Sequence, residues 1–398
     1  MATSVIFLGT FFGAIFLGWY SDQYGRKRLL YVGFVGVIVS NFLTVYMPNI
    51  WLFIALRFVS GFLVAAVHLC YYVMITETVG DRYRSSAGNI LWLYYTVALC
   101  ILPLKAYLLT SWKLLVIICS LPYLIMIVSY GFVPESVRWL RLKSKFNNAM
   151  ETFQRIADWN EKNVEFSSLA ILPVTESKER TNIGDLFHPK ETALTSVVFV
   201  FCFYTNSLVY FGTSLASSDL GTDSIYLNFL LVSLVEFPAL SLATFCCDRF
   251  GRKWSSSVLL ALAGFVILLV SITPKTSNAF TVFRIILSMT GKLFVSISFP
   301  SIFNWVVEVY PTNIRSEALG IMGIAVNIGG ASAPWVAKGL TQVTKQLPLY
   351  VMGTMGLVAG ILCRSLPETK EISMKESRSE TKENTQEFET IKNLNFLS

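Results

Sequence analysis

Charged residues are scarce in this chain. Asp, Glu, Lys and Arg together make up 14% of its 398 residues, while 54% are hydrophobic. A soluble domain usually carries about 25% charged residues. The composition therefore excludes an ordinary soluble domain and indicates a polytopic membrane protein. The net charge of +7 does not indicate a nucleic-acid partner, because the basic residues fall mostly in alternate loops and form no single patch.

Recognisable catalytic and cofactor-binding patterns are also missing. The sequence has two histidines and seven cysteines, and none of them shows metal-ligand spacing. It has no phosphate-cradling loop and no plausible nucleophile triad, so we expect no enzyme activity, no cofactor and no nucleotide. The cysteines lie inside or at the ends of apolar runs, which favours a packing role. There is no Asn-x-Ser/Thr acceptor for a glycan, and we expect a monomer.

Long apolar runs dominate the sequence instead. We identify eleven runs long enough to cross a bilayer as helices, five before a long polar segment and six after it. They cover residues 2–20, 29–48, 51–76, 87–109, 113–133, 192–214, 225–246, 255–273, 284–306, 318–339 and 348–365. The lipid bilayer is thus a predicted partner of most of the chain.

A short charged turn appears twice. Asp22-Gln-Tyr-Gly25-Arg26-Lys27 separates the first two runs, and Asp248-Arg-Phe-Gly251-Arg252-Lys253 returns about 230 residues later. Clustered basic residues in so short a loop favour the cytoplasmic face. Two further landmarks pair at a similar offset: residues 77–84 with 308–315, and Pro134-Glu135 with Pro367-Glu368. Three matches in the same order predict two halves in parallel repeat, with a path between them that works by rocking.

The long polar segment divides these halves. Phe146, Met150, Phe153 and Ile156 recur in it at helical spacing, which predicts amphipathic helices beneath the membrane. The end of the chain is rich in Lys, Glu, Ser and Thr and is predicted to be disordered and cytoplasmic. The predicted domains are an N-terminal helical bundle (1–133), a cytoplasmic loop (134–190), a C-terminal helical bundle (191–366) and a tail (367–398).

These motifs resemble the major facilitator superfamily, and within it the organic cation, anion and zwitterion transporter family. Pro134-Glu-Ser-Val-Arg-Trp-Leu140 resembles the family's Pro-Glu-Ser-Pro-Arg-Trp-Leu, with Val137 in place of proline. Glu308-Val-Tyr-Pro-Thr-Asn-Ile-Arg315 resembles its Glu-Leu-Tyr-Pro-Thr-x-x-Arg. The resemblance implies an all-α polytopic fold of two helical bundles. It begins at the family's second helix, so we expect about eleven transmembrane helices, with helix 1 and the large extracellular loop after it lacking.

The resemblance also implies a function. We expect a plasma-membrane transporter of small organic ions that works by alternating access through a central site. Val235-Glu236-Phe237-Pro238-Ala239 is similar to the organic cation branch, which favours organic cations or zwitterions. One alternative is a truncated, non-transporting paralogue or regulatory membrane protein. A second is a sugar-porter-like carrier, although residues 203–212 do not resemble the Gln-Gln-x-Ser-Gly of sugar porters.

Glu236 and Lys292 are charged residues that lie well inside predicted spans. Glu236 should face the bundle interior, because a carboxylate facing lipid would cost several kcal/mol. It either attracts a cationic substrate or is a structural acid paired with a neighbouring helix. Lys292 either pairs with Glu236 or presents positive charge to an anion. If the two pair, neither alone sets the charge of the substrate.

Other candidates for substrate binding are neutral at neutral pH. Asn327 stands where the cation branch usually has an aspartate and the anion branch an arginine, so a zwitterion or neutral amide is not excluded. His68 either couples transport to protons or packs between helices. Aromatic residues either form a cage for an organic cation or pack against lipid and core. These aromatic candidates are Tyr210, Phe203, Tyr94, Trp92 and Trp305.

The charged turns form a second candidate set. We predict ion pairs at the cytoplasmic end that link the two halves when that side is closed, and that break and reform during transport. The alternative is that these residues only set topology and anchor helix ends. The predicted gate residues are Asp22, Gly25, Arg26, Lys27, Glu77, Arg84, Glu135, Arg138, Asp248, Gly251, Arg252, Glu308 and Arg315.

Overall fold

The computed structural model describes residues 2–79, 81–161, 186, 190–216, 224–274, 277–310 and 314–368. The chain divides into two compact units, Met1–Glu176 and Ser177–Ser398. The boundary between them falls within the polar segment 134–190. Nearly all of the predicted tail, 367–398, lies outside the described residues, so its predicted disorder stays a prediction.

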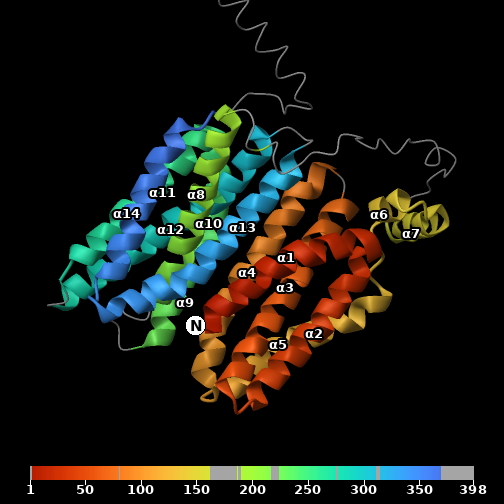
Figure 1. Cartoon of the computed structure of the whole chain (residues 1–398), viewed down its shortest axis with the longest axis horizontal. Coiled ribbons are helices and arrows are strands. Elements are labelled where there is room, and N and C mark those ends of the chain that lie inside the picture. The colour runs from red at the N-terminus through yellow and green to blue at the C-terminus, as the bar shows by residue number, and fades with distance from the viewer. Residues whose placement is uncertain are drawn as a thin grey trace, which may run out of the picture. The chain divides into compact units, whose positions relative to one another are not determined.

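Unit 1 is a bundle of membrane-length helices followed by two short ones (Figure 1). The long helix α3 packs against both α1 and α2, and α2 also packs against α5. The closest approach is at Gly61, where an added Cβ would lie 2.1 Å from the Ile6 carbonyl oxygen, so no larger residue fits there. The helices are α1 (Ala2–Tyr24), α2 (Arg26–Tyr46), α3 (Ile50–Thr78), α4 (Asp81–Leu108), α5 (Trp112–Val128), α6 (Val137–Leu142) and α7 (Phe146–Trp159), with a 3₁₀ turn at Ser129–Gly131.

Unit 2 is a larger bundle in which α8, α11, α12, α13 and α14 share one core (Figure 1). Phe199, Trp305 and Met322 are fully buried in it. The helices are α8 (Lys190–Ala216), α9 (Ile225–Leu234), α10 (Glu236–Phe250), α11 (Arg252–Ile272), α12 (Asn278–Val309), α13 (Arg315–Pro334) and α14 (Leu347–Leu362); a π turn (Trp335–Gly339) and a 3₁₀ turn (Leu340–Gln342) follow α13, and a 3₁₀ turn (Cys363–Ser365) follows α14.

Helix length and composition match a polytopic membrane protein. Among the described residues, ten helical segments are long and apolar enough to cross a membrane, and α9 with α10 counts as one of them. The shorter apolar stretch Trp92–Leu108 of α4 corresponds to the remaining predicted run. Large apolar side chains such as Phe16, Ile125 and Val128 are exposed on these helices. An exposed apolar surface of this kind suits contact with lipid and would be a liability in water.

Helices also form in the described part of the polar segment. Helix α6 is capped by Ser136, whose hydroxyl accepts a hydrogen bond from the Trp139 backbone N–H at 3.2 Å. Helix α7 packs against α6 (Figure 1). Its small residues Ala149 and Ala157 are buried, while Phe146 and Trp159 are exposed. The helix is thus amphipathic with apolar side chains left uncovered; its predicted position beneath the membrane stays a prediction.

Candidate functional site

The first charged turn is built on a glycine and a carboxylate. Gly25 has φ 110°, a conformation that side-chain-bearing residues rarely adopt. It ends α1 and lets α2 start at Arg26. The Glu135 carboxylate accepts hydrogen bonds from the backbone N–H groups of Arg26 and Lys27, both at 3.1 Å, and from that of Ser136 at 3.0 Å. The N–H groups of Arg26 and Lys27 lie in the first turn of α2, where they have no intrahelical partner and carry the positive end of the helix dipole. Glu135 therefore caps α2.

The Arg26 side chain turns back toward α1 and α3. Its Nη2 lies 3.2 Å from Asp22 Oδ1, and its Nε lies 3.5 Å from Glu77 Oε2. The Arg26 and Glu77 side chains are 9% and 12% exposed, whereas Asp22 is 71% exposed. The partly buried Glu77 contact should therefore be the stronger of the two, because water screens the Asp22 contact.

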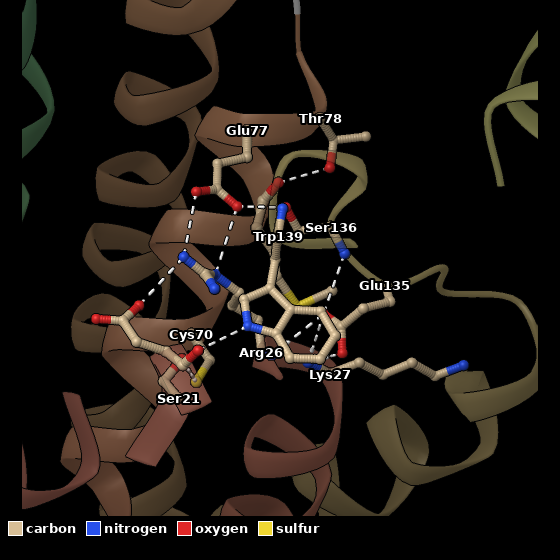
Figure 2. Close-up of polar contacts among 11 residues, drawn as sticks. Ser21, Arg26, Lys27, Cys70, Glu77, Thr78, Glu135, Ser136 and Trp139 are labelled. Carbon is tan, nitrogen blue, oxygen red and sulfur yellow. Dashed lines mark hydrogen bonds and ion pairs between the residues drawn. The ribbon is translucent and has the colours of Figure 1, made fainter. Parts of the chain in front are cut away.

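The start of α6 closes the same cluster. Figure 2 shows Arg26 and Ser136 both in contact with the Glu77 carboxylate. The Ser136 hydroxyl donates to the Glu77 carboxylate, and the Trp139 indole N–H donates to the Asp22 carbonyl oxygen at 2.9 Å. The polar segment is thus attached to the turn by side chains of the Pro134–Leu140 motif.

The second charged turn repeats this plan in unit 2. Gly251 has φ 85°, and Glu368 accepts from the backbone N–H groups of Arg252 at 3.2 Å and Lys253 at 3.5 Å. The Arg252 guanidinium pairs with Glu308 through both Nε and Nη2, each at 2.9 Å from Oε1. The paired landmarks of the two halves therefore occupy matching places in the two units.

The other predicted gate residues do not belong to the ion pairs described above. Asp248 and Arg138 are exposed, and the side chain of Arg84 lies outside the described part of the chain. Arg315 donates from Nε to the Tyr310 carbonyl oxygen at 3.3 Å, and the Tyr310 hydroxyl lies 2.8 Å from Ser196 Oγ. Burial lowers the pKa of Arg315 and raises that of Tyr310, so Tyr310 stays neutral near neutral pH. Each ion pair described here lies within one unit; the predicted link between the halves stays a prediction.

A buried ion pair occupies the middle of unit 2. Lys292 Nζ on α12 lies 3.3 Å from Glu236 Oε1 at the start of α10, and their side chains are 1% and 7% exposed. The chain breaks its helix at Val235 directly before the glutamate. The structure thus places Glu236 and Lys292 as partners, which is one of the two arrangements that the sequence left open. Removing either charge would leave the other buried and uncompensated, typically a loss of about 3–5 kcal/mol.

Helix α8 completes the coordination of this pair. The Tyr210 hydroxyl donates to Glu236 Oε1 at 2.6 Å. The Lys292 ammonium donates to the Tyr210 carbonyl oxygen at 3.1 Å and to Ser214 Oγ at 2.8 Å. It also lies 3.1 Å from the centroid of the Tyr210 ring. Three helices therefore meet at one charge pair whose formal charges cancel, which is a stable arrangement for ionisable groups within a membrane.

Two further sequence candidates, Phe203 and Asn327, belong to helices of unit 2. The Phe299 ring lies 5.7 Å from the Tyr210 ring in a tilted arrangement, and Phe303 continues the aromatic contact to Phe203 at 4.7 Å. Phe203 itself is 1% exposed and packs in the core. Asn327 on α13 donates to the Gly323 carbonyl oxygen of its own helix at 2.9 Å.

The other aromatic candidates lie elsewhere. Trp305 is fully buried and donates its indole N–H to the Pro367 carbonyl oxygen at 3.0 Å. Tyr94 and Trp92 belong to α4 of unit 1 and are exposed, and His68 on α3 is exposed too. In unit 2, Phe203 and Trp305 are thus core residues, and Tyr210 is the aromatic candidate bound to the charge pair.

Sequence reasoning missed several members of these clusters. Ser214 is one helical turn after Tyr210, and that spacing is the signal that would have found it. Ser136 has no signal in the sequence that sets it apart from other serines, because its role depends on its contact with Glu77 of a distant helix. Glu368 was matched to Glu135 in the repeat but was not assigned to the gate.

Comparison with known proteins agrees with this architecture. Residues 1–380 match the family model described as sugar (and other) transporter. The chain is 31% identical to solute carrier family 22 member 2 of Rattus norvegicus, over 92% of this chain and 66% of that relative. It is 30% identical to solute carrier family 22 member 13 of Homo sapiens, over 94% of this chain and 67% of that relative. The chain thus spans about two thirds of the length of these curated relatives.

A solved structure shows the same fold. The proton:xylose symporter XylE, bound to 6-bromo-6-deoxy-D-glucose, aligns with a TM-score of 0.67 at 19% identity, covering 94% of this chain and 87% of XylE. The chain belongs to the sugar (and other) transporter family of the major facilitator superfamily, and within it to the organic cation, anion and zwitterion transporters. It is a multi-pass membrane protein. The family is one of transporters, which confirms the prediction against an enzyme.

Proposed function

We propose that this protein carries small organic cations or zwitterions across the plasma membrane by alternating access to a central site. The observation that supports this most is the buried Glu236–Lys292 pair with its Tyr210 hydrogen bond. A membrane helix bundle rarely holds ionisable residues without a functional reason. The relatives named above belong to a family of organic ion transporters.

The pair suggests how such a substrate is bound. An incoming ammonium group competes with the Lys292 ammonium for the Glu236 carboxylate. Tyr210 offers an aromatic face beside that carboxylate, which suits a cation. A zwitterion brings its own carboxylate to satisfy the displaced Lys292, so the site stays neutral when loaded. Binding of this kind changes the contacts among α8, α10 and α12, and it is such differential contacts that shift a conformational equilibrium.

We also propose that the charged turns form a cytoplasmic gate for this transport. They carry Arg26 and Arg252 with adjacent lysines, and positive loops favour the cytoplasmic side of a membrane. We place the turns, the polar segment and the tail on that side. The Arg26–Glu77 and Arg252–Glu308 pairs would hold each turn in shape in one state and loosen in the other. Free-energy changes of a few kcal/mol suffice for such a transition.

Uptake measurements test the proposal. The full chain, reconstituted in proteoliposomes, should take up tetraethylammonium or the zwitterion glycine betaine in a saturable manner. The Glu236→Gln variant should lose uptake, because neutral glutamine cannot attract an ammonium group and leaves Lys292 uncompensated. The matched control is Glu151→Gln, which makes the same change at an exposed position on α7.

Two results would contradict the proposal. Uptake that is unchanged in Glu236→Gln would remove the pair from substrate binding. Saturable uptake of neither compound by the wild-type chain, with the protein folded in the membrane, would favour a non-transporting membrane protein.

A further inference from the structure

A separate cavity of about 560 Å³ lies in unit 2, at the end of the bundle opposite the Gly251 turn. Small-molecule sites in proteins typically measure roughly 300–1,000 Å³. The cavity is lined by Thr213 of α8, Val270 near the end of α11, Ser288 of α12 and Leu349 of α14. Glu236 and Lys292 do not line it, although Ser288 is one turn from Lys292 on α12. The two charges of the pair therefore lie outside the cavity lining.

A buried arginine forms part of the cavity wall. Arg284 is 6% exposed, and its Nη1 donates to the carbonyl oxygens of Val270 at 3.0 Å and Thr273 at 2.6 Å. These contacts hold the guanidinium at the end of α11, where carbonyl groups have no helical partner. They leave the Nε donor buried without a hydrogen-bond partner in the described part of the chain. An unmet buried donor on a full positive charge favours an anionic ligand.

The rest of the lining has matching chemistry. Lys345 adds a second positive charge, and no Asp or Glu is among the described lining residues. The cavity should therefore repel cations and attract anions. Its walls include the apolar side chains of Val232, Ile267 and Leu349. These suit the carbon body of a ligand and leave the charged end for the guanidinium.

We propose that this cavity binds a small organic carboxylate, with the carboxylate beside the Arg284 guanidinium and Lys345 at the rim. A guanidinium edge can hold a carboxylate through two parallel hydrogen bonds, which gives direction as well as affinity. The site takes the charge class opposite to the one proposed for the Glu236–Lys292 pair. In the orientation proposed above, it faces the outside of the cell. Its position there rests on that proposal, but its ligand class does not.

Direct binding tests this inference. The full chain, purified in neutral detergent free of anionic lipid, is titrated with benzoate by calorimetry, and with benzamide as the neutral control of the same size. Benzoate should bind saturably and benzamide should not. Arg284→Lys keeps the charge but loses the two-donor edge, so binding should weaken at least about tenfold. Lys345→Gln should weaken it less, by about threefold, because the residue is exposed.

Variants of the charge pair separate this inference from the proposed function. Lys292→Met and Glu236→Gln should keep benzoate binding even where they abolish uptake. If they abolish benzoate binding while Arg284→Lys and Lys345→Gln retain it, the anion uses the central pair and the inference is wrong. Absence of saturable benzoate binding in the wild-type chain overturns it as well.

A labelling experiment maps the site without altering the arginine. Ser288→Cys places a thiol in the cavity, and Val343→Cys places one on the exposed surface near it, where the native side chain is 72% exposed. Benzoate should slow modification of Ser288→Cys by a methanethiosulfonate reagent, after subtraction of the parent chain's background, and should leave Val343→Cys unaffected. Equal protection of both positions, or of neither, would contradict the assignment.

Discussion

The turn before Arg26 and the turn before Arg252 share a backbone plan but differ in their side-chain contacts. In unit 1 the capping carboxylate of Glu135 receives three backbone N–H groups, and Arg26 divides its guanidinium between two acids at 3.2 and 3.5 Å. In unit 2 Glu368 accepts from the Arg252 and Lys253 N–H groups at the longer distances of 3.2 and 3.5 Å. Arg252 there makes a 2.9 Å contact with Glu308. The cap bonds are shorter in unit 1, and the ion-pair contact is shorter in unit 2.

This difference indicates what each turn requires. Both keep a glycine at positive φ and a carboxylate over the start of the next helix, because the chain must reverse there and satisfy that helix's free N–H groups. The geometry of the ion pair differs between the two turns, so it is the part of this arrangement that can vary. Matched substitutions in the two turns therefore test how much the glycine, the cap and the ion pair each contribute.

The largest effect is expected for the glycines. In Gly25→Ala the new Cβ would lie 2.6 Å from Glu135 Oε2, and in Gly251→Ala it would lie 2.9 Å from Glu368 Oε2. Both changes also force alanine into a conformation that costs about 1–3 kcal/mol. Hydrogen exchange measured by mass spectrometry should show faster opening at each mutated turn, more so for Gly25→Ala. Unchanged exchange at both turns would refute the importance of the positive φ.

The capping carboxylates come next. Glu135→Ala should destabilise the α1–α2 turn by about 2 kcal/mol, because it removes a charged acceptor from three N–H groups. Glu368→Ala should cost less, since its bonds to the start of α11 are longer. Thermal unfolding of the purified variants in detergent measures the difference. A larger loss for Glu368→Ala would reverse the comparison.

For the ion pairs we expect a smaller difference in free energy between the turns, with the stronger coupling in unit 2. A double-mutant cycle on Arg252 and Glu308 should give a coupling free energy of about 1 kcal/mol, after allowance for their partial exposure. The same cycle on Arg26 and Glu77 should give less, because the distance is longer and the arginine is shared with Asp22. Equal coupling in the two cycles would mean that the static distances do not represent the working interaction.

The smallest effect is expected for the aspartates that open the two motifs. Asp22→Asn should cost only a few tenths of a kcal/mol, because the pair with Arg26 is an exposed contact one turn along a helix. Asp248→Asn should change unfolding within error, since Asp248 has no ion pair among the described contacts. A marked loss of uptake with no loss of stability, in either variant, would assign that aspartate a role in transport rather than in folding.

Much of the fold was predictable because lipid imposes a strong pattern on the sequence. The run 29–48 corresponds to α2 at Arg26–Tyr46, and the run 225–246 to the α9–α10 segment that ends at Phe250. The start of α12 was misplaced: the apolar run was predicted from residue 284, whereas the helix begins at Asn278. Arg284 lies inside this helix. The structure buries it, because it can bind the carbonyl groups that end α11.

The site was predictable residue by residue but not in its pairings. Glu236 and Lys292 stand out because they are charges within apolar runs, yet their contact depends on how α10 and α12 pack. The burial of Phe203 and Trp305 likewise depends on packing, since an aromatic residue suits lipid, core and substrate site alike. The Arg284 cavity was missed for the same reason: five separate segments form it, and no motif marks it.

The proposed role of Glu236 in binding a cation is tested most directly by the affinity of tetraethylammonium for the purified chain, measured by calorimetry with and without Glu236→Gln. We predict saturable binding to the wild type and at least a tenfold loss in the variant, about 1.4 kcal/mol, with Asp248→Asn binding as the wild type does. Equal affinity in wild type and Glu236→Gln, with both proteins folded, would contradict it.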